Sequence, residues 1–425
     1  MDTLNGSDPQ EIWTPTSQAE LARWLERNAA GAKRAVVPVG GRTALGVGHP
    51  VADGAVTVSL SQLTQVVDYP ARDMTVTVEA GIRVDELTRL LAAEGQRLAV
   101  DIPQAERATL GGAVATNVSG PRRYGLGTLR DYVIGISAVD ARGRAFKAGG
   151  RVVKNVAGYD LCKLLVGSLG TLAVVTQVTL KLKPLPESSA LYWLPVPELA
   201  TADRLLAALV TSRARPVAIE LLNATAAQSI AQQTHITAPT SPFVLLVGVE
   251  GAAREVEWQI ETLKAELSSS DSRLARTLVG EDATRVWAAL TEYQIPTEEP
   301  ASFKANLLPS RLIAFVEQAN SLGAAVQAHA ASGIVHGHLP ERIATLDQAS
   351  AAITALRQAA RASGGNLVIS GCDPAWKNSL PLFGDEEPGW GWMRALKRKL
   401  DPDDLLNPGR FLTEPATTAG IKSPK

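Results

Sequence analysis

The stretch from Asp101 to Pro184 constrains the fold most, because glycines and small hydroxyl and amide residues recur in it at close spacing. Its two densest parts read DIPQAERATLGGAVATNVSGPRRYG and KNVAGYDLCKLLVGSLGTLAVVTQVTLKLKP. Glycine lets the main chain approach a phosphate or a planar ring without a Cβ in the way, and Ser, Thr and Asn supply hydrogen bonds. We therefore predict that this stretch cradles a flavin.

Composition limits the class of protein. At 425 residues, with 45% hydrophobic and 20% charged residues, the chain is too long for one ordinary domain, so we expect two. Forty-two basic against 43 acidic residues leave a net charge of −1, which argues against a nucleic-acid partner. Two cysteines exclude a disulfide framework, and also a cysteine-ligated iron–sulfur cluster built from this chain alone.

Signals for secretion or membrane insertion are absent from the sequence. Its start, MDTLNGSDPQEIW, lacks the basic and apolar regions of a signal peptide, and no run of about 18 apolar residues occurs. We therefore expect a cytoplasmic protein without a transmembrane segment. Docking at the inner face of the membrane through partners stays open.

A further glycine pair follows a buried strand expected at residues 35–39. The strand runs into Gly40, Gly41, Arg42 and Thr43. A strand followed by two glycines and a hydroxyl is how main-chain amides form a nest for a pyrophosphate. The residue orders of a P-loop and of a dinucleotide fingerprint are absent, so we exclude both. By itself, the loop is also compatible with a tight turn.

Small residues after Thr109 favour a short helix that ends near Asn117. It would contain Gly111, Gly112 and Thr116, and close packing of small residues is the alternative interpretation. Hydrophobic periodicity and a capping box at Ser17 predict the surrounding scaffold, with helices at 17–29 and 84–94 and strands at 55–60, 74–80, 132–139, 144–148 and 172–182.

Four ordered motifs resemble one known superfamily. VVPVGGRTALG, ATLGGAVATNVSGPRRYG, KNVAGYDLCKLLVGSLGTLAVVT and LDPDDLLNPGRF are similar to the FAD-binding domain of the vanillyl-alcohol oxidase and p-cresol methylhydroxylase (PCMH) superfamily. The resemblance covers roughly residues 10–186 and 395–412, and it implies an α+β fold with a PCMH-type, two-subdomain FAD-binding domain. KNVAGYDL and GSLGTL most resemble the FAD-binding accessory subunit, the E subunit, of bacterial glycolate oxidase.

The resemblance also implies which residues hold FAD. The pyrophosphate would lie on residues 38–43, the ribityl chain and ring near 109–120 and Lys154, and the adenine half on the backbone near 168–175. The implied set is Pro38, Val39, Gly40, Gly41, Arg42, Thr43, Thr109, Gly111, Gly112, Thr116, Asn117, Gly120, Lys154, Ser168, Gly170, Thr171, Val174 and Val175. Because the loop at 40–43 carries no histidine, we expect FAD to be bound non-covalently.

Residues 187–375 read as a duplicated unit. Two βαββαβ patterns follow one another, and two such ferredoxin-like units can share one antiparallel sheet with helices on one face. In the resembling family this arrangement is the cap over the flavin. We expect the FAD-binding domain at 10–186, the cap at 187–375, a segment returning to the FAD domain at 376–412 and a disordered tail at 413–425. Residues 223–242 and 371–392 are expected to be long loops.

The residues that carry chemistry are less clear. Oxidation of a 2-hydroxy acid on a flavin needs a base for the hydroxyl proton and a cation or metal for the carboxylate. His336 and His338 share one face of an expected strand, and Arg123 lies beside the expected ring-binding helix; structural roles are the alternative for all three. Companion Asp-Gly-Asn and Glu-His-Gly motifs of related catalytic subunits are missing, so we expect no metal site.

Two functions remain open at this point. In the first, the chain is the FAD-binding subunit of a glycolate oxidase complex, beside a catalytic flavin subunit and an iron–sulfur subunit, and supports oxidation of a small 2-hydroxy acid. In the second, it is a stand-alone FAD-dependent D-2-hydroxy-acid dehydrogenase. The incomplete histidine motif favours the first.

Overall fold

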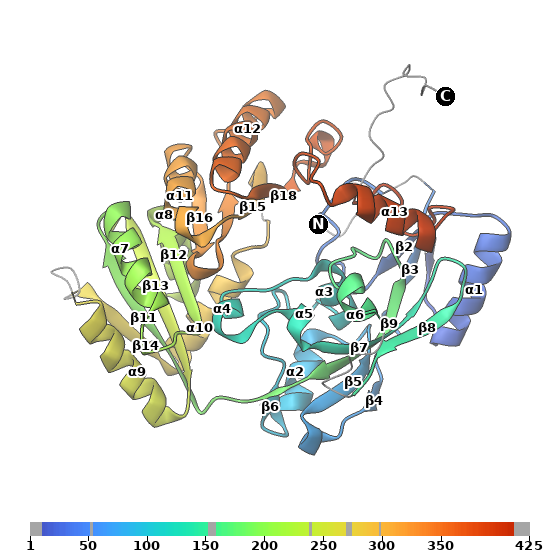
Figure 1. Cartoon of the computed structure of the whole chain (residues 1–425), viewed down its shortest axis with the longest axis horizontal. Helices are drawn as coiled ribbons and strands as arrows, with labels where there is room; N and C mark the ends of the chain where they lie inside the picture. The colour runs from blue at the N-terminus through green and yellow to red at the C-terminus, as the bar shows by residue number, and fades with distance from the viewer. Residues whose placement is uncertain are drawn as a thin grey trace.

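The computed structural model describes residues 11–51, 54–151, 159–237, 240–268, 274–296 and 299–411. Figure 1 shows an N-terminal body, blue to green, beside a second body of green, yellow and orange elements, and the red helix α13 returns to the first body. The expected tail at 413–425 lies outside the described residues. Within the described part, every helix is too short or too polar to cross a lipid bilayer.

The N-terminal body contains two main sheets. One is parallel, in the order β1-β3-β2, and the other is antiparallel, in the order β4-β5-β9-β7-β8. A further antiparallel pair joins β6 and β10. The strands are β1 (Glu11–Trp13), β2 (Val36–Val39), β3 (Val56–Ser59), β4 (Val66–Asp68), β5 (Thr75–Glu79), β6 (Gln96–Arg97), β7 (Val133–Val139), β8 (Ala145–Gly149), β9 (Val174–Lys181) and β10 (Lys183–Pro184).

Six α-helices cover these sheets. The first begins as the capping box predicts, because the Ser17 hydroxyl accepts a hydrogen bond from the Glu20 amide at 3.2 Å. Its Leu21 and Leu25 are fully buried one turn apart, which fixes its inner face. The helices are α1 (Gln18–Ala30), α2 (Val84–Ala92), α3 (Leu110–Thr116), α4 (Arg123–Leu126), α5 (Leu129–Tyr132) and α6 (Leu161–Leu165).

The second body is built on one antiparallel sheet of eight strands. Its order, β14-β11-β13-β12-β16-β17-β15-β18, places the two predicted units edge to edge, joined through β12 and β16. This agrees with the expected α+β class and with a cap made of two units. The strands are β11 (Ser188–Val196), β12 (Ala218–Asn223), β13 (Phe243–Gly251), β14 (Arg276–Val279), β15 (Ala301–Asn306), β16 (Ala325–His329), β17 (Ile334–His338) and β18 (Asn366–Cys372).

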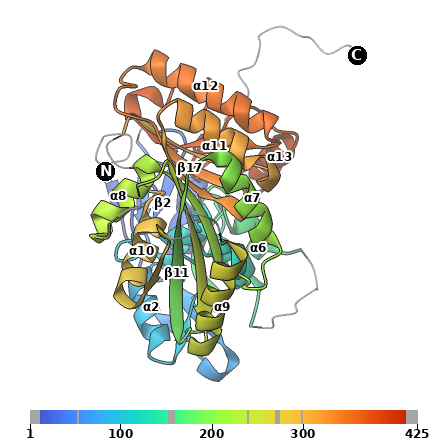
Figure 2. The same cartoon turned by 90° about the vertical axis from the view of Figure 1, so that its left-hand side faces the viewer.

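Helices lie on both faces of this sheet, so the expectation of a single helical face was wrong. α7 (Leu199–Val210), α9 (Ala253–Glu266), α11 (Leu312–Ser321) and α12 (Leu346–Ala362) contribute to the larger apolar core. α8 (Ala224–Thr234) and α10 (Gly280–Glu292) bury a separate cluster around Trp193 and Trp287 on the opposite face (Figure 2). The expected loop at 223–242 therefore contains a helix, because Asn223 caps an alanine-rich turn that buries Ile230.

The C-terminal segment returns to the parallel sheet of the first body. After α13 (Trp390–Leu400), the chain runs beside β2, where the Val36 amide donates to the Leu405 carbonyl at 2.7 Å and the Asn407 amide donates to the Val36 carbonyl at 2.9 Å. The segment Leu405–Asn407 therefore lies beside the first residue of β2.

Candidate functional site

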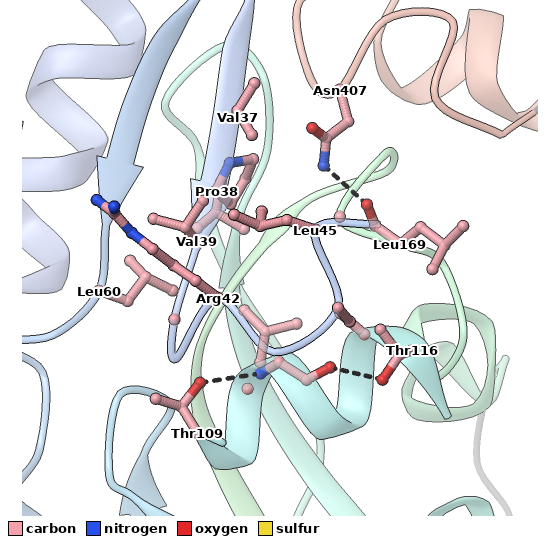
Figure 3. Close-up of a pocket in the computed structure, with 18 of the residues that line it drawn as sticks. Val37, Pro38, Val39, Arg42, Leu45, Leu60, Thr109, Thr116, Leu169 and Asn407 are labelled. Atoms are coloured by element: carbon pink, nitrogen blue, oxygen red, sulfur yellow. Dashed lines mark hydrogen bonds between the residues drawn. The ribbon is translucent and has the colours of Figure 1, made fainter. Parts of the chain in front are cut away.

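A cavity opens at the carboxyl end of β2 (Figure 3). The loop after β2, the start of α3, the turn before β9 and the C-terminal segment form its walls. Of the residues implied to hold FAD, those that line it are Pro38, Val39, Gly40, Gly41, Arg42, Thr43, Thr109, Gly111, Gly112, Thr116, Ser168, Gly170, Val174 and Val175. The fold thus brings four distant motifs to one place.

The first glycine pair packs against the residues that precede α3. A Cβ on Gly40 would lie 1.9 Å from the Thr109 hydroxyl oxygen, and one on Gly41 would lie 1.7 Å from the Arg107 carbonyl oxygen. Neither position has room for a side chain, so only glycine fits there, and the main chain lines the cavity directly. Arg42, with φ of 58°, then turns the chain in a left-handed conformation.

Hydrogen bonds order the small-residue helix α3. The Thr109 hydroxyl caps it by accepting from the Gly112 amide at 3.3 Å, and the Thr116 hydroxyl donates to the Gly112 carbonyl at 2.9 Å (Figure 3). The two hydroxyls thus hold the first and the last turn of α3 at the cavity wall. This is the short helix that the sequence predicts.

Several polar atoms around the cavity are buried without a partner in the described residues. They include Ser168 Oγ, Asn407 Oδ1 and Asn117 Oδ1. A buried oxygen without a hydrogen bond is costly, so these atoms indicate a polar ligand that the protein normally contacts. Together with the two glycines that admit no Cβ, they fit the pyrophosphate and polar groups of FAD.

Two cations from the C-terminal region hold the loop at 44–49. Lys377 Nζ donates to the Gly46 carbonyl at 2.6 Å, and Arg410 donates to the carbonyls of His49 and Leu45. Burial lowers the pKa of Arg410 to about 10. Arg410 therefore holds the loop in place, which is a structural role.

A second cavity lies between the two bodies. It shares Thr43, Thr116 and Leu169 with the first cavity, and Asn117 also lines it. From the cap, Lys304 on β15, His336 on β17 and Ser370 on β18 face it. A cofactor that extends from the first cavity would therefore meet polar cap residues here.

Lys304 and His336 are opposite each other on neighbouring strands. Burial, and then the charge of Arg123, lowers the pKa of Lys304 to about 8. Burial, followed by the charges of neighbouring groups, holds the pKa of His336 well below its usual value of 6.5. At neutral pH the pair thus consists of a cationic amine and a neutral imidazole, whose unprotonated ring nitrogen can accept a hydrogen bond.

The neighbour of His336 is His329 rather than His338. The rings of His329 and His336 lie 5.2 Å apart, and His329 Nδ1 lies 2.8 Å from Glu220, whose carboxylate also accepts from Gln327 at 2.7 Å. His338 shares the strand face of His336, as predicted. However, its ring nitrogens contact Glu299 and the Tyr293 carbonyl, which turns them away from His336.

The remaining predicted residues lie outside the two cavities or the described part of the chain. Arg123 is half-buried near Lys304 and donates to the Ser119 hydroxyl at 2.8 Å. Gly120 packs against Asp101, and Thr171 lines a separate groove beside α13. Lys154 falls within the undescribed residues 152–158.

Lys304, Glu220 and Asn407 are site residues that the sequence reasoning missed. The alternation Ser302, Lys304 in an otherwise apolar strand was the available signal for Lys304. Among the described residues, no three His, Cys, Asp or Glu side chains gather in a way that could hold a metal ion.

Family models match both parts of the chain. Residues 9–149 match a model described as "FAD binding domain", and residues 185–367 and 379–411 match one described as "FAD linked oxidases, C-terminal domain". Among solved structures, p-cresol methylhydroxylase with substrate bound superposes with a TM-score of 0.72 at 14% identity, over 96% of this chain and 91% of the other. This likeness supports the PCMH-type fold.

Some curated relatives are similar along nearly the whole chain, and others along only part of it. Glycolate oxidase subunit GlcD of Bacillus subtilis is 27% identical over 96% of this chain and 90% of its own length. The mitochondrial cytochrome-type D-lactate dehydrogenase of Arabidopsis thaliana is 28% identical over 95% and 73%. Glycolate oxidase subunit GlcE of Escherichia coli is 39% identical, but over only 29% of this chain and 36% of its own length. The similarity therefore does not single out the E subunit.

Proposed function

The chain belongs to the family of FAD-linked oxidases, and from this premise we propose that it is the FAD-binding subunit of a glycolate-oxidase-type complex that oxidises a small 2-hydroxy acid to the 2-oxo acid. One observation carries the proposal. The cavity that continues from the predicted FAD cradle is lined by a buried amine, Lys304, and a neutral imidazole, His336.

These two groups match the needs of the substrate. A 2-hydroxy acid presents a carboxylate, which the ammonium of Lys304 can bind, and a hydroxyl whose proton the neutral His336 can accept. The nearby guanidinium of Arg123 adds positive potential at the carboxylate end. When bound, FAD supplies the acceptor for the two electrons.

The other half of the site holds the cofactor. Residues 38–43, 109–116 and 168–175 would contact FAD. The domain boundaries at 186 and 375 and the return segment at 376–412 stay predictions. The loop Gly40–Thr43 has no histidine to attach to the ring, which supports non-covalent binding.

Partner subunits would take the electrons onward. Two of the relatives are subunits of glycolate oxidase, which supports a complex. The expected partners are a catalytic flavin subunit and an iron–sulfur subunit. With this assignment goes the proposal of a cytoplasmic location, in which any contact to the inner face of the membrane is made through those partners.

A second candidate function is a stand-alone D-2-hydroxy-acid dehydrogenase. The similarity to a D-lactate dehydrogenase along 95% of the chain favours it, and so does a polar cluster that needs no partner residue.

Anaerobic flavin spectra test both candidates. The purified, FAD-loaded chain is mixed with glycolate or D-lactate, and the absorbance of oxidised flavin at about 450 nm is followed. Under the subunit proposal, the band persists until the partner subunits are added and then bleaches. Prompt bleaching of the chain alone establishes the stand-alone dehydrogenase, and a protein that takes up no FAD contradicts both candidates.

A further inference from the structure

Five polar side chains form a row across one face of the cap sheet, and we call them the polar row. Glu220 on β12 is opposite His329 on β16, and Gln327 on β16 is opposite His336 on β17, which is also opposite Lys304 on β15. Residues opposite one another, and residues two apart on one strand, share a face. Glu220, Gln327, His329 and His336 are 0%, 1%, 3% and 5% exposed. Apolar side chains would stabilise this face better, so folding alone does not explain the row.

Hydrogen bonds at the β12 end of the polar row fix the proton positions. The Gln327 amide nitrogen donates to Glu220 Oε2 at 2.7 Å and to the Leu290 carbonyl at 3.1 Å, so the Glu220 carboxylate is an acceptor there. His329 Nδ1 lies 2.8 Å from each carboxylate oxygen. Because a carboxylate can only accept, His329 Nδ1 carries the hydrogen and donates it to Glu220. In the neutral ring, Nε2 is then the acceptor.

Two buried acceptors next to His336 lack a donor. His329 Nε2 and Gln327 Oε1 have no hydrogen-bond partner within the part of the chain that the structure describes. Such atoms are costly, which indicates a donor that is present at another stage of function. The rings of His329 and His336 have centroids 5.2 Å apart, and at this separation a ring N–H of His336 can reach His329 Nε2. Neutral imidazole has one N–H and imidazolium has two, so protonation of His336 supplies a donor.

A protonated His336 needs a nearby negative charge. Burial and then the positive charges of four neighbouring groups lower the pKa of His336; the four are His329, Lys304, His338 and Arg123. A base in these surroundings gains a proton only if another group offsets the charge. The Glu220 carboxylate reaches His336 through the ring of His329. This works only while that ring is neutral, because an imidazolium at His329 would repel a second one.

We propose that Glu220 is a positioning residue for the oxidation: through its hydrogen bond it keeps His329 Nε2 an acceptor, which stabilises His336 once His336 has taken the hydroxyl proton of the 2-hydroxy acid. This inference rests on the proposed function. The O–H bond of the substrate breaks and an N–H bond forms on His336. The other ring N–H of His336 donates to His329 Nε2, and Glu220 offsets the positive charge. The α-hydrogen and two electrons pass to bound FAD.

Nitrogen NMR of the histidine rings tests the proton positions without substrate. The FAD-loaded full chain carries isotope-labelled histidine, and His329→Gln assigns the signals. At about pH 8, where an ordinary imidazole is neutral, we expect the His329 hydrogen on Nδ1 in the wild type. In Glu220→Gln the new amide nitrogen can donate to Nδ1, so the hydrogen should move to Nε2. Asn223→Ala, at a buried polar residue of the same strand, is the matched control and should leave the hydrogen on Nδ1.

Anaerobic flavin reduction by glycolate, in the assembled complex, tests the consequence for the reaction. Glu220→Gln should lower the rate constant at saturating glycolate at least about tenfold, with unchanged glycolate dissociation constant and FAD content. Glu220→Asp keeps a carboxylate and should recover part of the rate. Asn223→Ala loses the cap of α8 and a bond to the Ala324 carbonyl, so it should melt earlier but reduce its flavin at the wild-type rate.

Four other outcomes would overturn the role of Glu220. These are a hydrogen on Nε2 or an imidazolium at His329 in the wild type, the wild-type rate in Glu220→Gln, an equal loss of rate in Asn223→Ala, and a divalent metal ion, one per chain, that His329→Gln removes. Failure of the proposed function looks different. A wild-type complex that never reduces its flavin, with the expected hydrogen positions in both proteins, contradicts the proposed oxidation, whereas reduction with the wrong hydrogen positions contradicts only the role of Glu220.

Discussion

The side-chain amide of Asn407 donates a hydrogen bond to the main-chain carbonyl of Leu169 at 2.8 Å, across 238 residues of sequence. Both residues adopt left-handed backbone conformations, with φ of 43° and 52°. A bulky leucine rarely adopts this conformation, and the bond helps to hold it there. The C-terminal segment thereby fixes the turn that forms one wall of the FAD cavity.

Replacing Asn407 should weaken cofactor binding. Asn407→Ala removes the bond to Leu169 and places alanine at a positive φ, so we expect a loss of about 1–3 kcal/mol in unfolding free energy and weaker FAD binding. Titration of the apoprotein with FAD measures the affinity. Asn407→Gly relieves the backbone but still lacks the amide, so equal affinity of this variant and the wild type would refute the role of the hydrogen bond.

The glycine pair after β2 should not tolerate alanine. Because a Cβ would lie 1.9 Å from Thr109 Oγ1 in Gly40→Ala and 1.7 Å from the Arg107 carbonyl oxygen in Gly41→Ala, both variants should bind little FAD. Gly46→Ala is the control in the same loop, since its Cβ would have no neighbour within 4 Å. The ratio of flavin to protein absorbance in each purified variant measures its FAD occupancy. Full FAD occupancy in Gly41→Ala would contradict the packing argument.

Lys304 should make the stability of the substrate-free protein depend on pH. Its pKa is about 8 in the folded protein against 10.5 ordinarily, so between these pH values the unfolded chain binds a proton that the folded protein does not. Stability from this group therefore rises as pH increases from about 8 to 10.5, by roughly 1.4 kcal/mol per pH unit. Urea unfolding of wild type and Lys304→Met should show this slope only in the wild type.

The same lysine should govern substrate binding. Since the proposed carboxylate contact needs the ammonium form, the dissociation constant of glycolate should increase about tenfold per pH unit above about pH 8. Spectral titration of the flavin with glycolate, in the assembled complex, measures it. Lys304→Gln should bind glycolate weakly at every pH; a variant that keeps the wild-type pH profile would assign the effect to another group.

A buried ion network should hold the cap on the FAD-binding domain. Arg122 of the first body lies 3.8 Å above the Trp287 ring and 3.2 Å from Glu250 of the cap, and Glu250 also pairs with Arg97. Glu250→Gln leaves Arg97 without its carboxylate and Arg122 with Asp101 alone, so we expect a loss of about 3–5 kcal/mol. Calorimetry of the Glu250→Gln variant should show the cap and the FAD-binding domain unfolding separately. Glu261→Gln, at an exposed pair with Lys264, should change stability by less than about 0.5 kcal/mol.

Local patterns were sufficient for much of the fold. The N-cap at Ser17, the apolar run of β7 and the small residues of α3 each specify an element through residues close in sequence. Helices α8 and α10 were missed because their apolar faces are short and alanine-rich. Their stability comes from packing on the far side of the cap sheet, which no local pattern reveals.

The sequence by itself determined which segments carry the glycines and capping hydroxyls that line the first cavity, because residue type is a property of each single position. Only the tertiary structure decided the rest of the site. Lys304 acquires its low pKa, and His336 its neutral state, from burial between two bodies, and His329 rather than His338 becomes the partner because strand order sets the neighbours. Burial and register depend on residues far away along the chain, so they exist only once the chain has folded.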